Sequence, residues 1–242
     1  MNSAYTSGSE PRHLESAFLK KAQKTLELIE YRKITTSKEI EDVQRLRFEA
    51  YSRENNVFSD RSFLRSDKFD NEKNAEIFGL YIENRLASSL RLHRVTSETP
   101  QTPSALYFPE FFMTRLARGD SFLEPTRFVA SEEFARRFPS LHFMTMRVCF
   151  MATVHYQVPF ILCSVRAEHG SYYRRYFGME AEVVGKRVPT IAVPADLYVG
   201  KVADKLPLVE ERLPFMRSTE DERHALFEDS FEAPRIRLVG SR

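Results

Sequence analysis

The segment from Pro139 to Gln157 constrains the fold of this chain most strongly. Its residues are nearly all apolar, and at helical spacing the apolar side chains fall on every side of the predicted helix. A helix that is apolar all round has to be buried over most of its surface. The chain has no run of about 18 apolar residues, so we expect no integral membrane segment and a helix that lies inside a folded domain.

The elements around this helix alternate between strands and helices. Phe177-Gly178 is a typical helix end, and the short turn at Glu83-Asn84-Arg85 predicts a hairpin. The mixed alternation predicts an α/β protein, which can also be described as α+β, with one central sheet and helices on its faces. We expect helices at 14–30, 37–55, 139–157 and 168–176, and strands at 31–35, 76–83, 86–94, 122–130, 159–165, 181–187 and 190–193.

Three segments depart from this regular pattern. Residues 1–13 are small and polar and are expected to be disordered. Residues 195–242 are expected to form a C-terminal extension of two short helices and an unstructured end. Residues 95–121 contain three prolines and an aromatic cluster, which favours a long loop with one helical turn. Loops of that length are uncommon unless they have a function. The predicted domain therefore spans 14–194.

Composition narrows the function classes. The chain of 242 residues has a net charge of only +2, so we expect no nucleic-acid partner. Its 8 glycines argue against folds that hold nucleotides in Gly-rich loops, and its six histidines lack ligand spacing, so no metal site is expected. A disulfide between Cys149 and Cys163 stays open, but two buried thiols are favoured. Residues 1–13 lack the apolar stretch of a signal peptide, so we expect a cytoplasmic protein. Nothing in the sequence demands an oligomer, so we expect a monomer.

Charged residues in apolar surroundings supply the candidate chemistry. Arg91 lies between Leu90 and Leu92, and Arg127 precedes Phe128 and Val129. A buried arginine needs a carboxylate partner, because an unpaired buried charge is very unfavourable. Ordinary surface ion pairs remain the alternative. We therefore expect three acidic residues to meet three arginines: Asp67, Asp70 and Glu124 with Arg47, Arg91 and Arg127.

The order of these residues is similar to that in a known family. The pattern Arg47-x-x-x-Tyr51, Ser66-Asp67-x-Phe69-Asp70, Ser89-Leu90-Arg91 and Glu124-x-x-Arg127-Phe128 resembles the acyl-homoserine-lactone (autoinducer) synthases and their relatives, the N-acyl amino acid synthases. Both belong to the GNAT acyltransferase superfamily. The resemblance covers roughly residues 30–190. It implies a GNAT-like, mostly antiparallel central sheet that is splayed in the middle to admit the acyl donor, with helices on both faces.

One departure from the autoinducer synthases favours an amino acid as the amine acceptor. Those enzymes typically carry a tryptophan where this chain has Val57, and this chain has no tryptophan. Tyr51-x-x-Glu54 instead resembles the corresponding run of N-acyl amino acid synthases. The resemblance thus implies transfer of a long-chain fatty acyl group to an amino acid, as a lipid signal. The alternative is an autoinducer synthase that uses S-adenosylmethionine in quorum sensing.

The resemblance also implies roles for individual residues. Glu124 is the candidate general base, Arg127 or Arg47 the anchor of the acceptor's carboxylate, and the backbone from Phe128 to Ala130 the donor of hydrogen bonds to the thioester oxygen. Glu124 and Arg127 can face one cleft only if the strand is bulged, which Pro125 favours. The loop 95–121 and the apolar helix are candidates for the acyl pocket. Substrate-binding residues are expected at Arg47, Tyr51, Asp67, Asp70, Arg91, Val129, Phe143, Met146 and Phe150.

The expected donor is an acyl carrier protein thioester, with no tightly bound cofactor. The segment 131–138 has no glycine and two acids, which makes it a poor site for the diphosphate of coenzyme A. Carrier proteins are acidic, so a basic patch would suit docking, although any of these residues can equally belong to a solvated face. The docking candidates are Arg136, Arg137, Arg147, Arg166, Arg174 and Arg175, with Lys186 and Arg187 beside them.

Two further functions stay open at this point. One is an ordinary acetyl-coenzyme A N-acetyltransferase, against which the poor phosphate loop counts. The other is a module without catalytic activity that binds a lipid or a carrier protein and has kept the fold.

Overall fold

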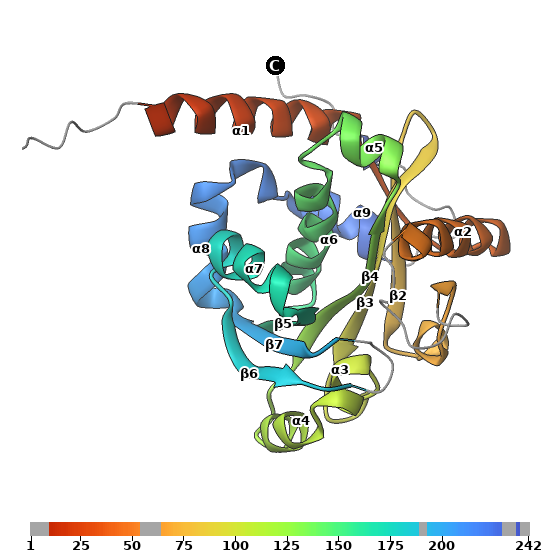
Figure 1. The fold of residues 1–242 in the computed structure, drawn as a ribbon, viewed down its shortest axis with the longest axis vertical. Helices are drawn as coiled ribbons and strands as arrows, with labels where there is room; N and C mark the ends of the chain where they lie inside the picture. Colours follow the sequence, from red (N-terminus) through yellow and green to blue (C-terminus); the bar gives the residue numbers. More distant parts are fainter. Residues whose placement is uncertain (1–9, 54–63, 189–192, 229–235, 238–242) are drawn as a thin grey trace, which may run out of the picture.

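The computed structural model describes residues 10–53, 64–188, 193–228 and 236–237, and these form one eight-stranded sheet with its helices. The strand order is β6-β7-β5-β4-β3-β2-β1-β8 (Figure 1). Neighbouring strands of this sheet are antiparallel except for β4 and β5, so the expected mostly antiparallel sheet is confirmed. The strands are β1 (Glu30–Lys33), β2 (Ala75–Ile82), β3 (Arg85–Val95), β4 (Phe122–Ala130), β5 (Phe160–Arg166), β6 (Glu180–Lys186), β7 (Ala195–Lys201) and β8 (Ile236–Arg237).

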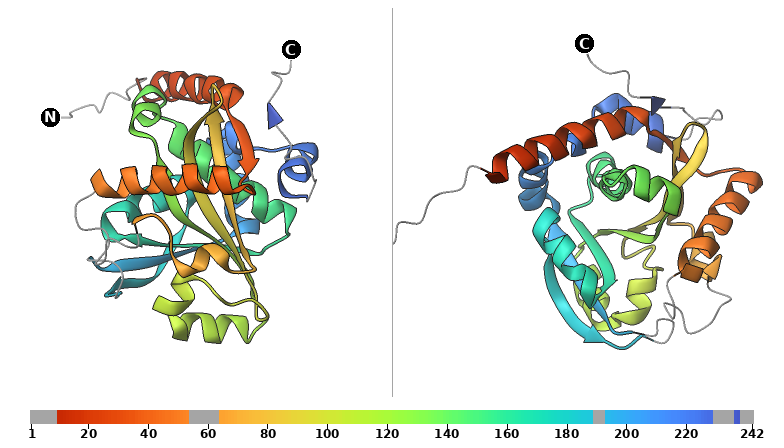
Figure 2. Two further views of the ribbon diagram at one scale, coloured as in Figure 1. Left: turned by 90° about the vertical axis from the view of Figure 1, so that its right-hand side faces the viewer. Right: turned by 45° about the horizontal axis from the view of Figure 1, so that its top comes forward.

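Helices cover both faces of the sheet, as expected (Figures 1 and 2). Helix α2 packs on β3 and β4 from one side, and α6 packs on the same two strands from the other. The α-helices are α1 (Glu10–Leu28), α2 (Ser37–Arg53), α3 (Pro103–Tyr107), α4 (Pro109–Leu116), α5 (Glu132–Arg137), α6 (Leu141–His155), α7 (Gly170–Phe177), α8 (Val202–Arg212) and α9 (Glu220–Phe227). Short 3-10 helices are η2 (Lys68–Asn71), η3 (Ala167–His169) and η4 (Pro214–Met216). None of the helices in the described part of the chain is long and apolar enough to cross a membrane.

Helix α6 forms the centre of the main core. Every residue from Phe143 to Thr153 is buried, because the sheet, α1, α5, α9 and η4 surround the helix. This confirms the prediction made from its all-round apolar sequence. Cys149 and Cys163 are free, buried thiols in the same core, which confirms the favoured alternative.

The sheet separates between β4 and β5. These parallel strands pair only at Phe122 with Phe160 and at Leu123 with Ile161, whereas β5 stays paired with β7 along its whole length. From residue 124 onward β4 therefore has β3 on one side and no strand of the described sheet on the other. The expected splay in the middle of the sheet is confirmed, and it leaves backbone groups of β4 open toward the gap.

Several predicted boundaries are wrong. The first helix begins at Glu10, so residues 10–13 are helical, and residues 95–121 contain two helices, α3 and α4. The domain does not end at 194, because β7 lies between β5 and β6 inside the sheet. Most of the strand expected at 190–193 lies outside the described residues, as do residues 1–9 and most of the predicted unstructured end.

The C-terminal extension is tied to the core by a buried ion pair. Arg147 on α6 donates from Nη2 to both carboxylate oxygens of Glu222 on α9, at 3.0 Å each, and from Nε to the carbonyl oxygen of Phe215 at 2.9 Å. Glu222 also completes a capping box with Thr219 at the start of α9. The Arg147 side chain is 1% exposed. The prediction that Arg147 belongs to a docking surface is therefore wrong.

Candidate active site

Strand β4 is bulged where the predicted catalytic arginine lies. Thr126 of β4 pairs with Arg91 of β3, and Val129 pairs with Ser89. Between these two pairs β4 has two residues and β3 has one, so β4 carries one extra residue. Arg127 has a φ of +54°, a left-handed conformation that side chains other than glycine rarely adopt. Because of this extra residue, Glu124 and Arg127 line the same cavity. The structure thus meets the condition that the sequence set for these two residues.

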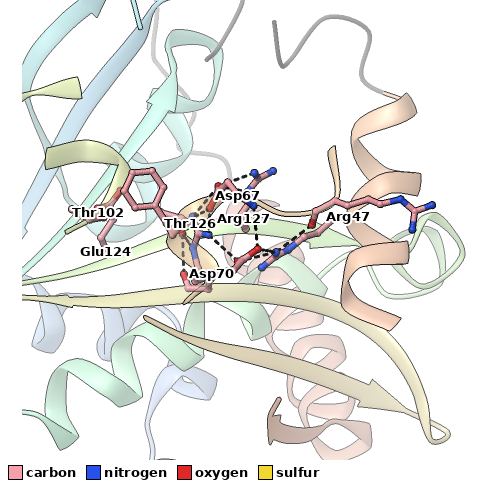
Figure 3. Close-up of polar contacts among 10 residues, drawn as sticks. Arg47, Asp67, Asp70, Thr102, Glu124, Thr126 and Arg127 are labelled. Carbon is pink, nitrogen blue, oxygen red and sulfur yellow. Dashed lines mark hydrogen bonds and ion pairs between the residues drawn. The ribbon is translucent and has the colours of Figure 1, made fainter. Parts of the chain in front are cut away.

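Three buried arginines converge on two aspartates (Figure 3). Arg91 Nη1 contacts Asp67 Oδ1 at 2.5 Å and Asp70 Oδ1 at 2.8 Å. Arg47 Nη1 donates to both oxygens of Asp70, at 2.8 and 2.9 Å. Arg127 donates from Nε and Nη2 to Asp67 Oδ2, at 3.0 and 2.7 Å. The expected pairing of these arginines with Asp67 and Asp70 is confirmed.

Local sequence fixes the two aspartates in place. Asp67 is the N-cap of η2, where its side chain accepts the Phe69 N–H at 2.9 Å, and Asp70 accepts the Asp67 N–H at 3.3 Å. This reciprocal capping box presents the carboxylates to the arginines. Burial raises the pKa of Asp67, but the hydrogen bonds and charges of Arg91 and Arg127 outweigh that effect and hold it at about 2.

Glu124 makes different contacts from those expected. It does not ion-pair with an arginine among the described residues; instead Ser104 Oγ donates to its Oε1 at 2.6 Å and Thr102 Oγ1 donates to its Oε2. The side chain is fully buried. Burial raises the pKa of Glu124 to about 7, against the lowering effect of the Ser104 and Thr102 hydrogen bonds and of the Arg91 charge. A carboxyl group of that pKa can take up and release a proton near neutral pH.

A cavity of about 260 Å³ fills the gap between the splayed strands. Arg91, Arg127, Asp67 and Glu124 are among its polar residues, and its other walls include aromatic and apolar side chains. A second cavity of about 440 Å³ adjoins it, because the two share Tyr51, Phe128, His169 and Tyr173. The remaining walls of the first cavity come from β4, β5, α2, α3, α7 and η3: Tyr51, Pro103, Tyr107, Pro125, Thr126, Phe128, Cys163, Ser164, Val165, Arg166, His169 and Tyr173.

Some predicted substrate-binding residues lie elsewhere. Arg47 and Asp70 line neither of these two cavities, and Arg47 is fully buried behind Asp70, so it cannot anchor a substrate carboxylate directly. Three residues of α6 belong to the core and line neither cavity, so their place in an acyl pocket stays a prediction: Phe143, Met146 and Phe150. Val129 lines the second cavity only.

The predicted basic patch is largely neutralised. Arg136 pairs with Glu132, Arg137 pairs with Glu83, and Arg166, which lines the first cavity, pairs with Glu168. Arg174 and Arg175 are exposed on α7, next to the tyrosines that line the second cavity. Lys186 and Arg187 are exposed as well.

Sequence reasoning misses the hydroxyl pair and Tyr173 of the site, whereas Tyr107 lies in the segment 95–121, which is a predicted candidate for the acyl pocket. Thr102 and Ser104 fall in the predicted loop, although a threonine before a proline is a typical helix start. Tyr107 and Tyr173 line the first cavity. Within the described ranges, no group of three or more histidines, cysteines or acids is placed to hold a metal ion. The charged groups of the cavity suit an anionic substrate instead.

A family model for the N-acyl amino acid synthase FeeM matches residues 42–200. The structure of FeeM, an N-acyl amino acid synthase from uncultured soil microbes, matches with a TM-score of 0.63 and 16% identity over 76% of this chain and 97% of that chain. The AHL synthase LasI matches with a TM-score of 0.54 and 12% identity over 76% and 93%. Escherichia coli ElaA matches with a TM-score of 0.51 and 13% identity over 72% and 99%. At these identities the structural matches show the fold alone. No curated protein matches the sequence significantly.

Proposed function

Because the chain belongs to the family of the N-acyl amino acid synthase FeeM and is an acyltransferase, we propose that it moves a long-chain fatty acyl group from a carrier-protein thioester to the amino group of an amino acid. One observation carries this proposal. A buried carboxyl group with a pKa of about 7 and a buried arginine line the same cavity between two splayed strands.

Glu124 is the proposed general base. An ammonium group has no lone pair, so the amine must lose a proton before it can attack the thioester carbon. The carboxylate of Glu124 accepts that proton directly or through one water molecule. The C–N bond then forms and the C–S bond breaks, and the thiol of the carrier's prosthetic group leaves with a proton. At neutral pH a carboxyl group with a pKa of about 7 can perform this step in both directions.

Arg127 is the proposed anchor for the carboxylate of the amino acid. Its left-handed backbone directs the guanidinium into the cavity, where Asp67 holds its Nε and Nη2. Arg91 and Arg127 both line this cavity, so their positive charges favour a negatively charged group of a substrate there. A planar guanidinium suits a carboxylate better than an ammonium does.

The gap beside β4 suits the thioester. Backbone N–H groups of β4 that face away from β3 have no strand partner in the described sheet beyond residue 123. Such groups near Phe128 to Ala130 can donate to the oxygen on which negative charge develops. Pro103, Tyr107 and Val165 give the same cavity an apolar side for the beginning of the acyl chain.

An acyl carrier protein suits this site better than coenzyme A as the acyl donor. Helix α5 follows β4 directly, has Glu132 and Glu133 in its first turn and lacks a side-chain cap at Ser131. Both carboxylates are paired with arginines, Glu132 with Arg136 and Glu133 with Arg85, but the segment 131–138 has no glycine that would let backbone N–H groups approach the diphosphate of coenzyme A closely. A carrier protein presents one phosphate at its surface, and the exposed Arg174 and Arg175 beside the second cavity are available to an acidic partner.

The test is mass spectrometry of lipid extracts from cells that express the chain. We expect amino acids that carry long acyl amides with the parent and with Arg45→Ala, which changes an exposed arginine on α2. Arg127→Ala should abolish them. Acyl-homoserine lactones in place of acyl amino acids would contradict the amino acid acceptor and make S-adenosylmethionine the substrate. Absence of both products, with the native carrier protein co-expressed, would contradict the proposal.

A further inference from the structure

Thr102 occupies the N-cap of α3 but does not cap it. An N-cap threonine normally accepts a backbone N–H of the first turn through its hydroxyl oxygen. No such bond is present here, and the Thr102 hydroxyl donates to Glu124 Oε2 instead. The two side chains lie next to each other in Figure 3. Thr102 is 1% exposed and Glu124 is fully buried, so this hydrogen bond is shielded from bulk water.

Ser104 holds the other oxygen of the same carboxyl group. Its hydroxyl donates to Glu124 Oε1 at 2.6 Å, and its side chain is fully buried. Pro103, between the two hydroxyl residues, and Tyr107, at the end of the same helix, line the cavity. One short helix and its N-cap therefore supply both hydrogen bonds to Glu124 and part of the wall that a substrate contacts.

Asn74 fixes the segment that leads into α3. Its Nδ2 donates to the carbonyl oxygens of Arg94, Thr99 and Gln101, at 3.2, 3.0 and 3.1 Å. The last of these residues directly precedes Thr102. Asn74, which directly precedes β2, thus fixes the backbone that leads to the hydroxyl pair, and the position of this pair does not depend on a bound substrate.

Other charged and titratable groups also face Glu124. On β3, Arg91 favours the ionised form through its charge, and His93 is the cross-strand neighbour of Glu124. On β5, Cys163 interacts electrostatically with Glu124. The remaining groups are those that line the shared cavity: Tyr51, Asp67, Tyr107, Arg127, Arg166, His169 and Tyr173. Among all these neighbours, the two hydroxyls differ in that each donates a hydrogen bond to one oxygen of the Glu124 carboxyl group.

We propose that Thr102 and Ser104 are positioning residues that hold the Glu124 carboxylate between two hydroxyl donors and so keep it ionised and oriented toward the cavity at neutral pH. The inference rests on the proposed function, in which Glu124 is the general base. A hydroxyl that donates to a carboxylate stabilises its charged form, whereas burial favours the neutral form. Without the two hydroxyl donors, burial would outweigh the charge of Arg91 and the backbone N–H of Ser104 further, so that more of Glu124 would be protonated at neutral pH and unable to accept a proton.

The experiment compares Thr102→Val, Ser104→Ala and the double variant with the parent. Each lost hydroxyl should raise the pH at which Glu124 ionises by about one unit. At pH 7 the rate should then fall about fivefold for a single variant and about fiftyfold for the double variant, and it should recover at higher pH. Thr102→Ser, which keeps the hydroxyl, should retain the parent's pH profile. Thr153→Val removes a buried hydroxyl that bonds within α6 and is the matched control.

Infrared titration of the Glu124 carboxyl group gives a readout that needs no substrate, with Glu124→Gln to identify its band. A midpoint that rises in Thr102→Val and Ser104→Ala supports the inference. An unchanged midpoint, or a rate that falls by the same factor at every pH, would overturn it and leave the hydroxyls a purely structural role. A raised midpoint in a protein whose parent makes no acyl amide supports the positioning role and contradicts the proposed function.

Discussion

Replacing Asp67 with asparagine is the sharpest test of the ionic cluster. The Asp67→Asn variant would keep the shape of the side chain and its ability to accept the Phe69 N–H, but would remove the negative charge between Arg91 and Arg127. These two arginine side chains are 1% and 5% exposed, so water cannot replace the lost charge. We therefore expect a loss of stability that is much larger than for a surface ion pair.

The size of the expected loss of stability follows from the pKa of Asp67. It is lowered from 3.8 to about 2, and a difference of this size corresponds to about 2.5 kcal/mol. Because the folded-state pKa lies below the unfolded one, this stabilisation is fully present above about pH 4 to 5 and is lost as the pH falls toward 2. In the variant, the buried arginines also lose a charged partner, which destabilises the folded state further. Asp67→Asn should therefore lower the free energy of unfolding by about 3 kcal/mol at pH 7.

Urea denaturation at pH 7 and at pH 3 measures the effect. The free energy of unfolding of Asp67→Asn lies below that of the parent, and this difference should be about 1 kcal/mol smaller at pH 3 than at pH 7. At pH 3 the parent has already lost part of the stabilisation by Asp67. Asp42→Asn, which removes a more exposed aspartate from a surface ion pair on α2, is the control and should cost less than about 1 kcal/mol. A deficit at pH 7 as small as that of the control, or one that does not change with pH, would refute this account of the cluster.

Three further predictions follow from the site and the core. The value of kcat/KM for acyl transfer should fall below pH 7, because the pKa of Glu124 is about 7 and its protonated form cannot accept the amine proton. A pH–rate profile without this decrease would contradict the role of Glu124 as general base. Arg127→Lys should raise KM for the amino acid about tenfold or more with a smaller change in kcat, as measured by steady-state kinetics, since an ammonium cannot replace a bidentate guanidinium. Arg147→Met should lower the free energy of unfolding by about 3 to 5 kcal/mol, and adding Glu222→Gln should recover part of it, as measured by urea denaturation.

Sequence reasoning predicts the parts of the fold that depend on local patterns. The nearly all-apolar α6, the hairpin of β2 and β3 and the bulge of β4 each follow from residues that are close in sequence. The pairing of Asp67 and Asp70 with buried arginines is also predictable, because a buried guanidinium requires a carboxylate. Helices α3 and α4 escape this reasoning because prolines usually signal a loop, whereas here they lie at the start of each helix, where proline is tolerated.

The errors concern partners that are distant in sequence. The expected arginine partner of Glu124 is replaced by hydroxyl donors from α3 and its N-cap, after a connection that no local pattern predicts. Arg147 lies in a helix without a polar face, which is a signal of burial, but its partner Glu222 lies 75 residues further along the chain. Strand β7 follows the last predicted strand and therefore falls in the predicted C-terminal extension, yet six of its seven residues are buried in the sheet.

The role of Glu124 in acyl transfer can be measured with purified protein, a carrier protein loaded with a long-chain acyl group and a mixture of amino acids. Mass spectrometry then compares amide formation by the parent and by Glu124→Gln, which keeps the size of the side chain but cannot act as a base. We expect an N-acyl amino acid from the parent and at least about 100-fold less from the variant. Equal amounts from both proteins, or no amide from a folded parent, would contradict this role of Glu124.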